Sequence, residues 1–186
     1  MTVNATTENP DTRDLTAAPT GERADLLTML AEHRHFLRFT TRDLSDEQAG
    51  LRTTASELCL GGLIKHVSAT ERGWVDFILE GPSAMGDFDD MTEEDFARRA
   101  DEFRMLPGET LAGVLDAYAE VARRTDELVA ALPDLDATHP LPKAPWFQDA
   151  HWSIRRVFLH IIAETAQHAG HADIIRESLD GAKTMG

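Results

Sequence analysis

The sequence predicts an all-α protein folded as a four-helix bundle, and three observations point to this class. Long segments repeat apolar residues at three- and four-residue spacing, as one face of a helix does. Residues that cap or break helices stand at the ends of these segments. Convincing alternation of apolar and polar residues, the pattern of a half-buried strand, is not found. We therefore expect no sheet.

The expected helices follow from these patterns. Four long helices are predicted, over residues 22–43, 56–79, 109–132 and 153–179. The second has candidate N-caps at its start, namely Thr53, Thr54 and Ser56. A shorter capped helix is expected from Thr92. Residues 134–151 contain several prolines, so an extended connection is expected there.

The length and composition indicate one domain with a flexible extension. Residues 1–20 are polar and lack periodicity, so we expect a flexible tail, followed by a bundle over 21–186. The net charge of −15 disfavours binding to nucleic acid or to an anionic membrane surface. No apolar run approaches the roughly eighteen residues of a membrane span. These features exclude partners without identifying one.

The same features suggest a cellular location. Cys59 is the single cysteine, so no disulfide can form within the chain, as is usual in a reducing compartment. It lies in an apolar stretch and is expected in the core. The first residues have neither a basic start nor an apolar stretch, so no secretory signal is expected. The expected location is the cytoplasm.

Ionisable residues gather on the last predicted helix. His160, Glu164 and His168 stack on one face because they are four residues apart, and His171 follows within a turn. At about 100° per residue, His168 falls within the apolar stripe and Glu164 at its edge. His160 and His171 lie further round the helix. Burying such groups is costly unless they are paired or bind a metal.

The second predicted helix offers a third candidate ligand. His66 follows Leu63 by three residues and precedes Val67, which puts it at the edge of the buried face. Metal sites in bundles are built from inward side chains of facing helices. Glu164 and His168 could chelate one ion, and His66 could complete three ligands with positions left open. Zn²⁺, Fe²⁺, Ni²⁺ and Co²⁺ all suit such a set. The alternative is a surface Glu–His ion pair and an ordinary histidine at the bundle edge.

Two segments resemble the signature regions of the DinB/YfiT-like superfamily. They are LGGLIKHVSATERGW over 60–74 and ETAQHAGHADIIRESLDG over 164–181. The resemblance extends from about residue 24 over nearly the whole chain, and is strongest to an actinobacterial DinB-like group without assigned function. It implies a four-helix bundle whose metal ligands are His66, Glu164 and His168. Zinc is the first candidate ion, with nickel, iron or cobalt as alternatives.

The sequence departs from the common motif of that superfamily. Many members have histidine at the first of the two positions on the last helix, followed by a His-Arg-Gly-Gln motif. Here Glu164 stands first, and residues 168–171 read His-Ala-Gly-His. The His–Glu–His set resembles that of mycothiol-dependent maleylpyruvate isomerases. His171 replaces the usual glutamine, so the resemblance does not imply that it binds the metal.

The resemblance also implies a reaction, since members of the superfamily use low-molecular-weight thiols such as mycothiol or bacillithiol. A divalent-metal-dependent enzyme is implied, a mycothiol-type S-transferase or isomerase acting on a small electrophile. His171 is the first candidate to move a proton, with His160 as the second. Glu71 is a candidate to support a metal ligand, and Trp146 to cover a pocket.

A second class of function stays open at this point. The chain could be a non-catalytic DinB-like bundle that binds a metal or small ligand in stress response or sensing, or acts as a scaffold. Pairing into a homodimer through an exposed face is compatible with either class. An open coordination position beside a cavity would favour an enzyme, and a fourth protein ligand would favour the alternative.

Overall fold

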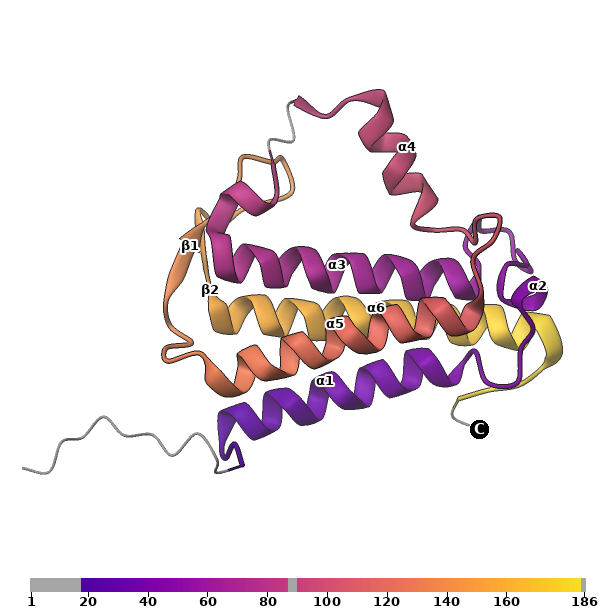
Figure 1. Cartoon of the computed structure of the whole chain (residues 1–186), viewed down its shortest axis with the longest axis horizontal. Helices are drawn as coiled ribbons and strands as arrows, with labels where there is room; N and C mark the ends of the chain where they lie inside the picture. Colours follow the sequence, from indigo (N-terminus) through magenta and orange to yellow (C-terminus); the bar gives the residue numbers. More distant parts are fainter. Residues whose placement is uncertain (1–17, 87–89, 185–186) are drawn as a thin grey trace, which may run out of the picture.

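The computed structural model describes residues 18–86 and 90–184, and it confirms the predicted all-α bundle. Four long helices lie side by side: α1 (Glu22–Phe39), α3 (Leu60–Glu80), α5 (Leu111–Ala131) and α6 (Ile154–Asp180) (Figure 1). The helices α1 and α3 each pack against both α5 and α6. The predicted tail falls almost wholly on residues 1–17, which lie outside the described part of the chain.

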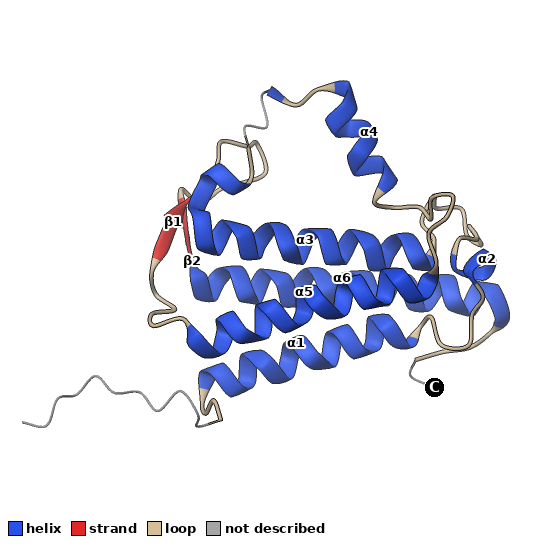
Figure 2. Cartoon of the chain, in the orientation of Figure 1, coloured by secondary structure: helices blue, strands red, loops and turns tan. Residues whose placement is uncertain are grey.

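Shorter elements join the long helices (Figure 2). They are α2 (Asp46–Ala49), the 3-10 helix η1 (Gly81–Ala84), α4 (Glu93–Asp101), β1 (Thr138–Pro140) and β2 (His151–Ser153). The helix α4 begins where Thr92 forms the predicted capping box with Asp95. It has no buried residue and stands away from the bundle on the side of α3 (Figure 1).

Two predicted helix boundaries are wrong by several residues. The helix α3 starts at Leu60, not near Ser56, because the hydroxyls of Thr54 and Ser56 hold short turns by accepting bonds from the amides of Ser56 and Leu58. The actual N-cap is Cys59, whose sulfur accepts a bond from the Gly62 amide. Cys59 is also buried, as expected.

The end of the first helix and the absence of strands also need correction. The helix α1 ends at Phe39, and Asp43, predicted inside it, has a left-handed φ of 59°. The strands β1 and β2 form an antiparallel pair in which His139 lies opposite Trp152. Each is only three residues long, too short to produce a recognisable alternation. Pro140 fits at the last residue of its strand.

A buried polar layer crosses the bundle between two apolar clusters. One cluster contains Phe77 and Phe158, and the other contains Leu63. Every long helix has at least one buried polar side chain, and we define this layer as Arg34, Glu71, Thr125 and Thr165. The pKa of Arg34 would fall through burial, but the charges of Glu71 and Asp126 and their hydrogen bonds raise it above its ordinary value. Arg34 therefore stays charged inside the protein.

The centre of this layer is the ion pair between Arg34 on α1 and Glu71 on α3. The Arg34 Nη2 donates to Glu71 Oε1 at 2.5 Å, and Nε donates to Oε2 at 3.2 Å. The hydroxyl of Thr125 on α5 also donates to Oε1, at 2.6 Å. Both carboxylate oxygens are thus satisfied by other helices, which makes the burial of two charges tolerable.

Replacing Glu71 by glutamine should destabilise the bundle strongly. The change leaves the buried Arg34 charge without its main partner, and losses of about 3–5 kcal/mol are typical of such broken pairs. Denaturant unfolding would measure the loss. Glu127→Gln is the matched control, because Glu127 makes an exposed ion pair with Arg123 and its loss should leave stability almost unchanged. Equal stabilities of the two variants would contradict this account.

A short segment after α4 packs closely against the start of α3, because two glycines leave room for it. A Cβ on Gly62 would lie 2.1 Å from the Phe103 carbonyl oxygen, and one on Gly61 would lie 2.4 Å from the Met105 sulfur. Lys65 holds the same segment by donating to the carbonyls of residues 101 and 104. The position of residues 101–105 is therefore fixed by α3 itself.

Gly62→Ala and Gly73→Ala should change stability in opposite directions. The alanine at 62 collides with backbone and should cost about 1–3 kcal/mol. The alanine at 73 meets nothing within 4 Å and should stabilise the helix by up to about 1 kcal/mol. Thermal unfolding of both variants tests this, and a stabilising Gly62→Ala would refute the close packing.

The described helices give no indication of a membrane span. Within residues 18–86 and 90–184, none combines the length and apolar character needed to cross a bilayer.

Candidate metal centre

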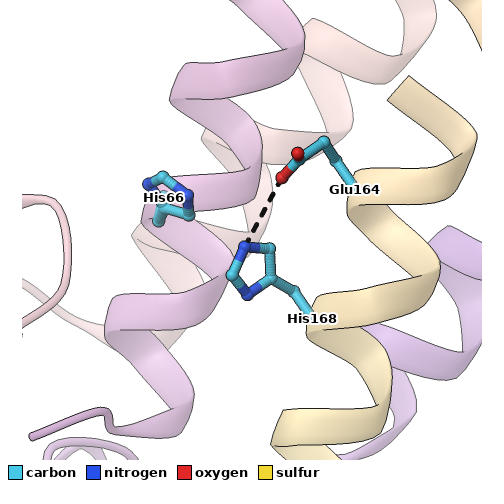
Figure 3. Close-up of side chains that lie close together, drawn as sticks. All are labelled: His66, Glu164 and His168. Carbon is cyan, nitrogen blue, oxygen red and sulfur yellow. Dashed lines mark ion pairs between the residues drawn. The ribbon is translucent and has the colours of Figure 1, made fainter. Parts of the chain in front are cut away.

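The structure brings the three predicted ligands together on two facing helices. His66 comes from α3, and Glu164 and His168 come from neighbouring turns of α6 (Figure 3). One potential ligand atom from each residue lies within 4.8 Å of the others. His66 is buried, and the other two are partly buried. The site lies beside the polar layer, since Thr165 directly follows Glu164.

Local helix packing explains this arrangement. On α6 the residues Thr165 and Ala169 are buried, so Glu164 and His168, each one position earlier, face the edge of the same surface. On α3 the residue Val67 is buried, so His66, one position earlier, also faces the edge of the buried surface. The edges of two packed helices therefore converge, and their polar side chains meet there rather than in the apolar core.

The distances leave a gap that an ion could fill. His168 Nε2 and Glu164 Oε2 are 3.6 Å apart, longer than an ordinary hydrogen bond. The rings of His66 and His168 meet edge to face, with centroids 5.0 Å apart. Bonds of about 2.1 Å to one ion would place ligand atoms about 3–3.5 Å from each other. Small side-chain rotations would achieve this, and two imidazoles with one carboxylate are donors that suit zinc and similar ions.

The electrostatic surroundings keep one candidate ligand, His168, ready to bind. Burial lowers the pKa of His168, and the neighbouring His66 lowers it further, while Glu164 opposes them. Burial also lowers the pKa of His160, again opposed by Glu164. The imidazole of His168 is therefore mainly neutral at pH 7, and only a neutral imidazole has a free lone pair for a metal.

The remaining predicted site residues lie in different surroundings. His171 Nδ1 is 3.5 Å from His168 Nδ1, and His160 Nε2 is 3.7 Å from Glu164 Oε1. Glu71 does not support a metal ligand as expected, because Arg34 and Thr125 occupy its carboxylate in the core. The sequence places Glu71 on the same helix as His66, about one turn further along. It does not show that the side chain of Glu71 points to Arg34 and Thr125.

A cleft of about 700 Å³ opens in front of this group. His66, Glu164 and His160 contribute to its lining, together with Arg99 and Glu102. Its other walls are largely apolar, with contributions from Trp74, Met85, Met91, Phe96, Trp146 and Phe147. Trp146 thus lines a pocket. His168 and His171 are not among the described residues of the lining, so the cleft reaches the group from the side of His66 and Glu164.

Two neighbours of His66 were not predicted from the sequence. Glu102 Oε2 is 3.3 Å from His66 Nδ1, and the Phe103 ring stacks on the imidazole with centroids 4.0 Å apart. Both residues belong to an irregular segment, where the spacing of apolar residues does not predict which way a side chain points. A signal did exist, since the glycine pair at 61 and 62 within an apolar helix stripe indicates close approach of another backbone.

The fold and this site define a class: a four-helix bundle with a potential three-ligand metal site beside a cleft. The family model for mycothiol S-transferases matches residues 25–181. The chain therefore belongs to the mycothiol S-transferase family, in agreement with the DinB-like resemblance of its sequence. No curated protein matches the chain.

Removing either histidine of the group should abolish stable metal binding. Purified wild-type protein that is loaded with zinc and then dialysed is expected to keep about one ion per chain. The variants His66→Ala and His168→Ala should keep almost none, because two ligands hold an ion far less well than three. Elemental analysis gives the stoichiometry. His35→Ala, on the exposed face of α1, is the control and should keep its ion. Full retention in both site variants would exclude this site.

Proposed function

We propose that the protein is a divalent-metal-dependent enzyme that transfers a mycothiol-type thiol to a small electrophile, with zinc as the first candidate ion. The observation that carries this proposal is the position of His66 and Glu164 in the wall of an open cleft, with His168 beside them. Membership of the mycothiol S-transferase family supports the choice of thiol. A cleft leading to three candidate ligands also favours an enzyme over a closed structural site.

The residues around the cleft would divide the work. His66, Glu164 and His168 would hold the ion. When bound, the ion would lower the pKa of the thiol and favour its thiolate form. The apolar wall that includes Trp74 and Phe147 would bind the electrophile and exclude water from it.

The proton needs an acceptor within the cleft. We assign this role to His160, which lines the cleft and whose Nε2 lies 3.7 Å from Glu164. His171, the first candidate from the sequence, lies next to His168 instead. In the proposed step, the thiol gives its proton to His160. The sulfur of the resulting thiolate then forms a bond to a carbon atom of the electrophile. The bond between that carbon and the leaving group breaks, and the leaving group departs with its electron pair.

Metal-loaded protein should conjugate mycothiol with a chlorinated bimane, and the fluorescent product measures the rate. Chelation of the metal, or Glu164→Gln, should reduce the rate to background. His160→Gln should keep the metal but lower the rate by about 10²–10⁴-fold, the usual contribution of a general base. Conjugation at the background rate by the metal-loaded wild type would contradict the transferase. An unchanged rate in His160→Gln would refute only the role of His160 as the base.

A further inference from the structure

One ring nitrogen of His66 already has a partner outside the group of three. Glu102 Oε2 lies 3.3 Å from Nδ1, and the two side chains are 32% and 9% exposed, respectively. His66 is thus buried and Glu102 half-buried, so the pair is screened less by solvent than a fully exposed one. Neither of the other candidate ligands has a carboxylate from a separate segment beside it, among the contacts of the described residues.

The backbone that carries Glu102 is held in place independently of the contact between its carboxylate and His66. The neighbours of Glu102 in the segment 101–105 pack onto Gly62 and accept bonds from Lys65, both within four residues of His66 on α3. The ring of Phe103 then covers the imidazole, with the two planes 25° apart. A single short segment thus supplies both a hydrogen-bond acceptor at the edge of the ring and a surface for its face.

These contacts determine the direction of the imidazole. With Nδ1 directed to Glu102, the remaining nitrogen is Nε2, and one ring nitrogen of His66 does lie on the side of His168 and Glu164 (Figure 3). An ionised carboxylate can only accept, so Nδ1 must carry the proton in this bond. The lone pair of a neutral His66 is then on Nε2, where an ion held by the group would need it.

We propose that Glu102 is the positioning residue of the metal centre: it fixes the tautomer and the direction of His66 and makes Nε2 a stronger donor. The inference rests on the metal site of the proposed function. Carboxylate partners of metal-binding histidines typically contribute about 10–100-fold to metal affinity. Glu102 would thus act through His66, without touching the ion.

The first test is the affinity for zinc, measured by competition with a chelator in the full-length protein. Glu102→Ala should weaken binding by about 10–100-fold, and Glu102→Gln, which can still accept a hydrogen bond, should weaken it less. Asp101→Asn is the matched control. It removes the same charge from the adjacent residue, whose carboxylate pairs with Arg104, and should leave the affinity unchanged. Equal affinities of Glu102→Ala and wild type would overturn the proposal.

The second test needs no metal. Long-range ¹H–¹⁵N correlation spectra of the metal-free protein at about pH 8, where histidines are neutral, report the tautomer of each ring. The wild type should show His66 protonated at Nδ1, and Glu102→Ala should shift it towards the Nε2 form while the melting temperature stays the same. A wild-type His66 protonated at Nε2 would refute the proposal. Failure of the wild type to bind zinc would instead refute the proposed function, and the tautomer would still decide the role of Glu102.

Discussion

The buried ion pair between Arg34 and Glu71 is the constraint on which the arrangement of the helices depends. Two charges can be buried here only if α1, α3 and α5 meet at one height, because Thr125 must also reach the carboxylate. An axial shift of α1 or α3 by a turn would separate Arg34 from Glu71 and leave both charges unpaired. The polar layer therefore selects one alignment of helices whose apolar surfaces alone could pack in several ways.

The candidate metal centre depends on this alignment. Glu164 directly precedes Thr165 of the polar layer, and His66 lies little more than one turn before Glu71. The polar layer fixes the height of α3 relative to α1 and α5. The packing of α3 against α6 then brings their edge residues opposite each other, without a loop to position them. Sites on rigid helices keep their geometry better than sites on loops. The segment that carries Glu102 adds a contact to His66 from outside the four long helices.

Much of this could be predicted from the sequence, because helices convert spacing into direction. The four long helices follow from periodicity, and the four-residue step from Glu164 to His168 places both on one face. The pairing of α6 with α3 could not be derived from spacing and came from the family resemblance. The start of α3 was misjudged because Ser56 forms a local turn instead of a cap. Glu71 was misassigned because its partner, Arg34, lies on a different helix.

The separation of His66 from Glu164 and His168 along the chain has a thermodynamic consequence. An unfolded chain cannot hold these three groups near one another, so an ion that needs all of them binds only the native bundle. Binding would then favour folding by mass action, with each tenfold excess of free ion over the dissociation constant adding about 1.4 kcal/mol. A metal bound to all three groups would therefore stabilise the folded bundle in addition to any chemical role.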